Sequence, residues 1–460
     1  MKDSTYRLVL IIAIMASIIA FLDGSIVNVA LPAIQRGLGG GLATQQWVVD
    51  AYLITLGAFM LVAGSLSDII GRKRVMMIGL IGFGVTSLLC AAANTKELLI
   101  VARLLQGVTG ALLVPSSLAL IMSSVPKSKQ NAAIGVWTSW TGIALLIGPF
   151  IGGVLVDLGS WRYIFLLNIP PIAVTAYLLA RLQDGHDTSK RVKIDWYGAL
   201  LGALSLGGIV YALIEQPHFG WANPLIYSTM AIGIVSFGLF IWREKVASQP
   251  MMPLGLFRSR NFTAGNIATL SIYAGLSLVA FLVTIFVQQV GHYTATAAGL
   301  MMVPTSILMF LLASRFGKLS GVYGSRIFMT VGPLIAAAGF VTMLFVDESA
   351  NYWSLLPGIL LFGIGLSVTV APLTAAILGA IESEKSGIAS AINNVVARVA
   401  GLVAVALIGT VTGYNLGLGG FRNGLTIAIA LFVIGGVVSF IGIRNPAKPA
   451  PEQLQTPAVE

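Results

Sequence analysis

The stretch GSLSDIIGRKR, from Gly64 to Arg74, joins two apolar runs at residues 46–67 and 75–93. Each run is long enough to cross a bilayer as a helix. Small residues at Gly64 and Gly71 permit close helix packing and a tight turn between the two helices. The stretch therefore predicts two membrane spans joined by a short loop, and through them a polytopic membrane protein.

The charges of this loop indicate the side of the membrane on which it lies. Its three consecutive basic residues, Arg72 among them, are expected to hold it in the cytosol. Asp68 can reach the amide end of a neighbouring helix or a basic side chain. The alternative is an ordinary basic loop, but the spacing G-x-L-x-D-x-x-G-R-K-R resembles the loop between the second and third spans of the major facilitator superfamily of secondary transporters. The resemblance implies that Gly64, Asp68, Gly71 and Arg72 take part in a conformational switch.

The composition agrees with a membrane protein. Hydrophobic residues make up 57% and charged residues 10% of the chain, and the mean hydropathy is +0.91. A soluble domain carries about 25% charged residues. The net charge of +10 is spread between apolar runs rather than gathered in one patch, so we expect no nucleic-acid partner. The partners expected are the lipid bilayer, protons and small organic molecules.

Apolar runs predict an all-α polytopic fold of about fourteen transmembrane helices. The runs lie near residues 8–30, 46–67, 75–93, 97–121, 131–158, 161–181, 194–215, 221–242, 261–290, 296–314, 326–346, 352–378, 386–414 and 421–443. An even number of spans puts both termini on one side. That orientation places 21 Lys and Arg residues in the cytosol and 4 outside, so both termini are expected to be cytoplasmic, in the cell membrane.

An internal repeat divides the chain. GKLSGVYGSR, at Gly317–Arg326, repeats the opening motif 253 residues later, with Gly321 in the place of Asp68. Spans one to six and nine to fourteen are therefore expected to be parallel copies, as in transporters whose halves rock around a central site. The expected domains are an N-terminal six-helix bundle (1–181), a linker with two extra helices and a loop (182–260), a C-terminal bundle (261–443) and a disordered cytoplasmic tail (444–460).

Three acidic residues in or near spans are candidate ion sites. Asp23, in FLDGSIVNVALP, lies among apolar residues, where a carboxylate costs a few kcal/mol and usually serves a function. It is a candidate proton carrier, and the alternative is a structural carboxylate hydrogen-bonded to Ser25, Asn28 or another helix. Asp50 is either a sensor of protons or cations at the outer vestibule or a solvated interfacial charge. Glu215 is either a peripheral cation contact or a loop-edge carboxylate.

Arg103 is the basic residue of the fourth span, in RLLQGVTG. An arginine keeps its charge at membrane depth and needs a carboxylate, carbonyl or water partner. Its surroundings match the superfamily's R-x-x-Q-G pattern, which implies that Arg103 couples protonation to conformational change. A purely structural ion pair is the alternative.

The fifth span contains GIALLIGPFIGG, in which Gly148 and Pro149 interrupt the helix and further glycines permit close packing. A kinked helix is the simplest interpretation. The pattern is also similar to the fifth-span signature of antiporters. With LDGSIVNVALP and fourteen spans, it makes the chain resemble the fourteen-span drug:proton antiporters of the superfamily over residues 1–443.

This resemblance implies a proton-driven exporter with no cofactor, no bound metal and no enzymatic activity. We expect the cargo to be amphipathic and cationic, in a cavity between the halves. The residues expected to line it are Asp23, Asn28, Trp137, Trp140, Tyr273 and Asn393, with Glu215 at its edge. Arg398, in NNVVARVAG, is expected to pair across the bundle. The alternatives are an exporter of lipids, siderophores or other metabolites, and a membrane enzyme or sensor. We expect a monomer, and the sequence contains no docking domain for a periplasmic adaptor.

Overall fold

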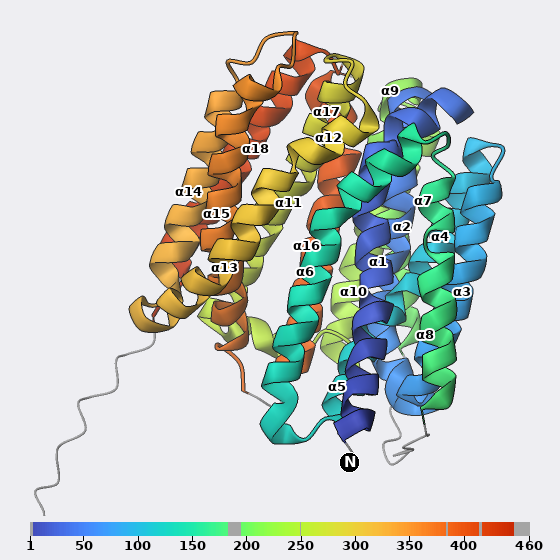
Figure 1. Cartoon of the computed structure of the whole chain (residues 1–460), viewed down its shortest axis with the longest axis vertical. Coiled ribbons are helices and arrows are strands. Elements are labelled where there is room, and N and C mark those ends of the chain that lie inside the picture. The colour runs from blue at the N-terminus through green and yellow to red at the C-terminus, as the bar shows by residue number, and fades with distance from the viewer. Residues whose placement is uncertain (1–2, 183–194, 249, 383–384, 414–415, 446–460) are drawn as a thin grey trace, which may run out of the picture.

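The computed structural model describes residues 3–182, 195–248, 250–382, 385–413 and 416–445. Within these ranges every regular element is a helix (Figure 1). Fourteen helical segments are long and apolar enough to cross a membrane, which confirms the predicted number of spans. The linker from residue 183 to 194 and the tail from residue 446 lie outside the described residues, as do some side chains within helices, including that of Asp68.

The first six spans contain eight helices. They are α1 (Asp3–Leu38), α2 (Gly41–Ile70), α3 (Arg72–Ala92), α4 (Lys96–Ala111), α5 (Leu113–Ser124), α6 (Lys127–Asp157), α7 (Tyr163–Leu166) and α8 (Ile169–Arg181). The two inserted spans are α9 (Trp196–Phe219) and α10 (Pro224–Val246), followed by the short helix η1 (Leu254–Arg258). The last six spans are α11 (Arg260–Gln289), α12 (Ala295–Met301) with α13 (Val303–Tyr323), α14 (Ser325–Met343), α15 (Tyr352–Leu378), α16 (Ser386–Ala406) with α17 (Ile408–Thr412), and α18 (Leu418–Gly442).

Proline explains two of the broken spans. The fourth span is divided into α4 and α5 three residues before Pro115, and the tenth into α12 and α13 two residues before Pro304. A proline inside a helix removes one backbone hydrogen bond and clashes with the carbonyl four residues earlier. The predicted fourth and tenth spans therefore do cross the bundle, although each of these two consists of two helices.

The repeat is visible in the backbone. Gly71, between α2 and α3, has φ 94° and ψ 138°, and Gly324, between α13 and α14, has φ 85° and ψ 151°. The two glycines are 253 residues apart, the displacement of the sequence repeat. Residues other than glycine rarely adopt a positive φ of this kind. Each half therefore makes its second loop with the same glycine-dependent turn.

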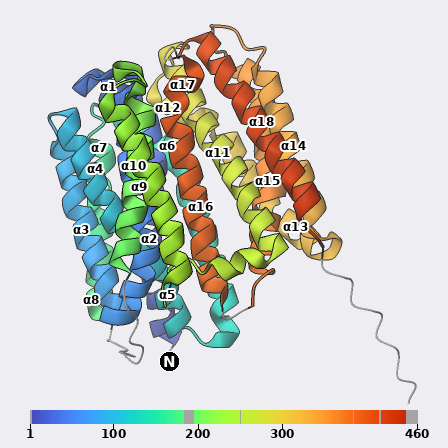
Figure 2. The same ribbon diagram turned by 180° about the vertical axis from the view of Figure 1, so that it is seen from behind.

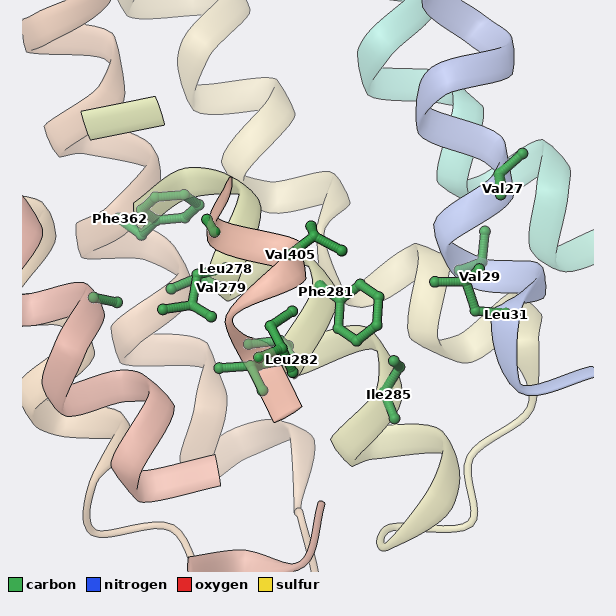
Figure 3. Packing of buried hydrophobic residues seen from close by; sticks show 14 of the residues in the cluster. Val27, Val29, Leu31, Leu278, Val279, Phe281, Leu282, Ile285, Phe362 and Val405 are labelled. Atoms are coloured by element: carbon green, nitrogen blue, oxygen red, sulfur yellow. The ribbon is translucent and has the colours of Figure 1, made fainter. Parts of the chain in front are cut away.

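We call the side of the bundle that carries the N-terminus the inner side and the opposite side the outer side. The halves pack together at the outer side, where buried residues of α1 meet those of α11. Figure 3 shows Val29 and Leu31 of α1 near Phe281 and Ile285 of α11, within one hydrophobic cluster. The core of the molecule is thus continuous between the halves at this level.

The inserted helices lie across this junction. Helix α9 contacts α2 of the first half and α16 and α17 of the second, while α10 packs against α9 (Figure 2). A small cluster of buried side chains joins Ile54 of α2, Val210 and Ile214 of α9, and Leu402 and Ala406 of α16. The insertion thus touches both halves at once.

Candidate functional site

A buried polar cluster lies in the outer half of the N-terminal bundle. Asp23 is 0% exposed and Arg103 is 1% exposed. The Nη1 of Arg103 donates to Oδ2 of Asp23 at 2.6 Å and to Oε1 of Gln106 at 2.7 Å, and its Nε donates to the carbonyl of Val48 at 2.9 Å. These bonds join α1, α2 and α4, so the two charges that the sequence singled out form one ion pair.

Two amide side chains complete the coordination of the carboxylate. Nε2 of Gln106 donates to Oδ1 of Asp23 at 3.2 Å, and Nδ2 of Asn168 donates to the same oxygen at 2.9 Å. Both amides also donate to the Ser87 hydroxyl of α3. Asn168 directly precedes α8, so the cluster joins five helices. Asp23 is thus a carboxylate hydrogen-bonded to other helices, as the structural alternative predicted. A role in proton transfer stays a prediction.

Aromatic rings cover the arginine. The guanidinium carbon of Arg103 lies 4.3 Å from the ring centroid of Tyr52 and 5.8 Å from that of Phe165. Such contacts favour a desolvated guanidinium. Asp23 itself is 0% exposed, so in this conformation its carboxylate does not lie on a surface between the halves, and a role in cargo binding stays a prediction.

Glycines of the GPFIGG motif pack α6 against both halves. A Cβ added at Gly152 would lie 2.9 Å from the Ile26 carbonyl of α1, and one at Gly153 would lie 2.6 Å from the Cα of Thr296 in α12. A Cβ at Gly148 would overlap the Ser25 hydroxyl of α1, and Gly299 of α12 packs on the backbone of Pro149. The motif thus fits α6 between α1 and α12, a contact between the halves.

Asp157, at the end of α6, makes the second contact between the halves. Its carboxylate accepts hydrogen bonds from the backbone amides of Ala295 at 3.2 Å and Thr296 at 2.8 Å. It therefore caps the N-terminus of α12, where the helix dipole favours a negative charge. Sequence reasoning missed this residue, because an acid at the end of a span is typical of a solvated interfacial charge.

Glutamines add four further hydrogen bonds between the halves. Gln46 of α2 donates to the carbonyls of Val405 at 2.7 Å and Ala406 at 3.0 Å. In α11, Gln288 donates to the carbonyl of Val29 at 3.1 Å, and Gln289 donates to Oε1 of Gln35 at 3.1 Å. We call these bonds, the Asp157 cap and the packing of Gly153 and Gly299 the outer seam. All of its members lie at the outer ends of their helices.

We expect Gln46→Leu to weaken the outer seam. The substitution would leave two buried carbonyls of α16 without their donor, at a cost of about 1–3 kcal/mol. We expect both the thermal unfolding temperature in detergent and the rate of cargo transport to fall. Gln130→Leu is the control, because the Gln130 amide also donates to two backbone carbonyls, those of Met122 and Val125, but within the first half. Equal effects of the two variants would contradict a specific role for the seam bonds.

Asp50 and Glu215 lie beside the seam. Asp50 is 0% exposed and neither carboxyl oxygen has a hydrogen-bond partner among the described residues. It is one helical turn from Gln46 and one from Ile54, on the face of α2 that meets α9 and α16. The interpretation of Asp50 as a solvated charge is therefore wrong. Glu215 accepts a hydrogen bond from Nε1 of Trp47 at 2.7 Å, which ties the inserted helix α9 to α2.

The remaining predicted cargo residues fall into two groups. Trp137 is buried, and its Nε1 donates to the Ser17 hydroxyl at 2.9 Å, whereas Trp140 is 49% exposed. Asn28 and Tyr273 are half-buried. Asn393 donates to Asn266 and Thr269 of α11 within the C-terminal half. The structure thus distributes these residues over both halves without bringing them into one cluster.

The loop between α2 and α3 is bound to the inner end of α8. Nζ of Lys73 donates to the carbonyl of Leu182 at 2.5 Å, which links the start of α3 to the end of α8. Gly64 has open space where a Cβ would stand, so close packing does not explain it in this conformation. The role of Asp68 and Arg72 in a switch stays a prediction.

Comparisons with known proteins agree on the family. The sequence profile of the Major Facilitator Superfamily matches residues 13–405 and 265–460. The multidrug resistance protein Stp of Mycobacterium tuberculosis (strain CDC 1551 / Oshkosh) is 32% identical over 410 residues, which are 89% of this chain and 76% of the relative. The methylenomycin A resistance protein of Bacillus subtilis (strain 168) is 32% identical over 418 residues, 89% of this chain and 88% of the relative.

Solved structures support the fold. A bacterial homologue of the human lysosomal transporter Spinster, in an inward-facing and unoccupied conformation, aligns with a TM-score of 0.69 at 12% identity. The alignment covers 96% of this chain and 98% of that one. At this identity the likeness concerns the fold alone.

Proposed function

Since the chain belongs to the Major Facilitator Superfamily, a family of membrane transporters, we propose that it exports amphipathic organic molecules from the cell in exchange for protons. The names of its relatives, which concern multidrug and antibiotic resistance, support efflux. The observation that carries the proton part is the Asp23–Arg103 pair, buried in the first half and bonded at 2.6 Å. Buried ionisable groups at membrane depth are typical of proton relays.

The outer seam supports transport by alternating access. The hydrogen bonds that join described residues of the two six-span halves lie at the outer ends of the spans. We infer that the structure is closed to the outside, a conformation of the inward-facing kind that the Spinster homologue also adopts. Transport would then require the seam to open while contacts form at the inner side.

Protonation of Asp23 would be coupled to this seam through α1. A proton on Asp23 removes one charge of the pair and leaves the Arg103 guanidinium buried, which costs about 3–5 kcal/mol if nothing moves. Movement of α1 would relieve that cost, and α1 also carries Ile26, against Gly152, and Val29, bonded to Gln288. A proton entering the cell supplies ~2.3 kcal/mol per 100 mV of membrane potential.

Asp50 is the second candidate proton carrier. A charged carboxylate buried without a partner costs several kcal/mol, and protonation removes that cost. Its place beside Gln46 would let opening of the seam expose it to outside water. The two candidates therefore predict different proton pathways, one inside the first half and one along the seam.

The charge of the cargo must be inferred from groups between the halves. A cationic cargo was expected because Asp23 would face it, but the carboxylate is fully buried in the cluster with Arg103, Gln106 and Asn168. Half-buried side chains such as Asn28 and Tyr273 are compatible with an amphipathic molecule. A lipid or siderophore exporter with the same machinery remains the alternative, which a narrow substrate range would favour.

We propose further that both termini lie in the cytosol and that the chain acts as a monomer without a cofactor. The distribution of basic residues supports the orientation. A membrane-impermeant label on cysteines added at either terminus would test it, because labelling of intact cells would contradict the assignment.

Proton exchange can be tested with purified protein in liposomes that carry an imposed pH gradient and an internal pH dye. We expect cargo addition to drive proton movement with the native chain and none above background with Asp23→Asn. Asp347→Asn is the matched control, because this carboxylate is exposed in a loop and accepts hydrogen bonds from the hydroxyl and amide of Ser349. Loss of coupling in Asp50→Asn but not in Asp23→Asn would move the proton site to the seam. Gradient-independent cargo movement by the native chain would overturn the exchange.

A further inference from the structure

We propose that the cargo carries an acidic group and that Arg398 of α16 binds it between the two halves. The proposal rests on the export function proposed above and refines its substrate class, since it replaces the expected cation with an amphipathic acid.

Arg398 points from the C-terminal half toward the N-terminal half. Its guanidinium carbon lies 5.2 Å from the ring centroid of Phe21, a residue of α1. The Phe21 ring in turn meets Trp137 of α6 edge to face, with ring centroids 6.5 Å apart. Val395, one helical turn before Arg398, packs on the hydrophobic cluster of the first half. The charged end of this side chain therefore lies between the halves, beside an aromatic wall.

The guanidinium of Arg398 has no acceptor among the described residues. No hydrogen bond or ion pair joins it to any residue that the structure describes, and its close contact there is with the Phe21 ring. Arg103, by contrast, donates to a carboxylate, an amide oxygen and a backbone carbonyl. We expected Arg398 to pair across the bundle, and its partner there is the aromatic ring of Phe21 and not a charged group. The side chain is also half-buried rather than sealed, so a molecule between the halves can reach it.

An arginine at membrane depth without an acceptor is stabilised by binding an anion. A guanidinium presents five N–H donors in a planar fork and is never deprotonated in proteins. Contact with a phenylalanine ring contributes about 0.5–2 kcal/mol and accepts none of these protons in a full hydrogen bond. A carboxylate or phosphate fits the fork with two parallel bonds. The apolar wall of Phe21 and Trp137 would take the body of the same molecule.

The acidic residues near the junction are already engaged or hidden. Asp23 is bonded to Arg103, and Asp157 caps α12. Glu215 accepts from Trp47, and Asp50 is 0% exposed. Among the side chains that the structure describes, none of these four carboxylates is presented to a cargo molecule between the halves, whereas the Arg398 guanidinium is. The local charge therefore selects for an acid and against a cation.

The proposal has an energetic consequence for export. Exchange of one entering proton for one departing monovalent anion moves two charges down an inside-negative potential. The membrane potential then contributes twice ~2.3 kcal/mol per 100 mV, whereas exchange for a monovalent cation would gain nothing from it. An acidic cargo thus makes fuller use of the membrane potential.

The test uses three probes with one apolar body and different head groups: naphthylbutanoate, naphthylbutanol and naphthylbutyl-trimethylammonium. Equilibrium binding to the purified full chain is measured at constant pH and ionic strength. We expect the native chain to prefer the carboxylate to the other two probes. Arg398→Gln should lower carboxylate affinity by about tenfold, as for loss of a hydrogen bond to a charged group, and change naphthylbutanol affinity by less than about twofold. Arg398→Lys should give an intermediate affinity, because it keeps the charge without the fork.

Arg181→Gln is the matched control. Arg181 also lies over an aromatic ring, with its guanidinium carbon 4.4 Å from the Tyr177 centroid, but it stands at the inner end of α8. The Arg181→Gln variant should bind all three probes as the native chain does. Equal binding of the three probes by the native chain, or an equal loss for all three in Arg398→Gln, would overturn the proposal. Proton-coupled transport in liposomes is scored separately: native transport without head-group selectivity leaves the exporter standing and rejects the acid site. Selective binding without proton coupling rejects the exchange alone.

Discussion

Arg103→Met is expected to lower the free energy of unfolding by about 3–5 kcal/mol and to abolish transport, because it leaves the Asp23 carboxylate buried without its cation. The pair is 0% and 1% exposed, so water cannot replace the lost partner without disrupting the packing of α1 and α4. Three hydrogen bonds are lost together, to Asp23, Gln106 and Val48. Thermal unfolding in detergent and transport in liposomes measure the two effects.

The double variant Asp23→Asn/Arg103→Met separates stability from function. Replacing both members of a buried pair is often close to neutral, so we expect it to recover most of the stability lost in Arg103→Met. It should not recover proton-coupled transport. Arg422→Met is a control for loss of an arginine, since the Arg422 guanidinium donates to the carbonyl of Val346 within the C-terminal half. A native-like unfolding temperature in Arg103→Met would contradict the energetic role of the pair.

The sequence was sufficient for the spans because each is decided by local hydropathy. Fourteen runs of apolar residues correspond to fourteen crossing segments, and the repeat of Gly71 at Gly324 corresponds to one backbone turn used twice. Even the breaks before Pro115 and Pro304 have a local cause. What local patterns could not give was the packing partner of each face.

The candidate site shows the limit. Asp23 and Arg103 were each singled out as charges at membrane depth, but they are 80 residues apart, and no pattern in one sequence pairs them. Gln106 shares a helical turn with Arg103 and belongs to the same R-x-x-Q-G pattern. Asn168 and Ser87 were missed, although a polar residue within an apolar run is the signal that found Asp23. Asp157 carried no such signal, because its partners are backbone amides of a distant helix.

Gly153→Val is expected to open the outer side of the protein and to reduce transport on the order of 10–100-fold, because overpacking at a tight contact costs about 1–3 kcal/mol. The Cβ would lie 2.6 Å from the Cα of Thr296. Because this neighbour is a backbone atom, no change of side-chain rotamer can relieve the clash. Helices α6 and α12 would have to separate, which also breaks the cap that Asp157 makes on α12. The cost falls on the state closed to the outside and not on a state in which the halves are already apart.

Cysteine labelling measures this shift directly. Cys90 is the only cysteine of the chain and is buried, so Ala295→Cys in a Cys90→Ser background gives a single reporter in the seam, where Ala295 is 4% exposed. A membrane-impermeant maleimide added outside should react about 10–100 times faster when Gly153→Val is present, since each 1.4 kcal/mol changes the ratio of the two states tenfold. Gly142→Val on the same helix is the control, because a Cβ there meets no atom within 4 Å. If both variants label alike, the glycines of the motif serve the shape of α6 alone. If only Gly153→Val labels faster, the motif holds the two halves together at the outer side through its contact with α12.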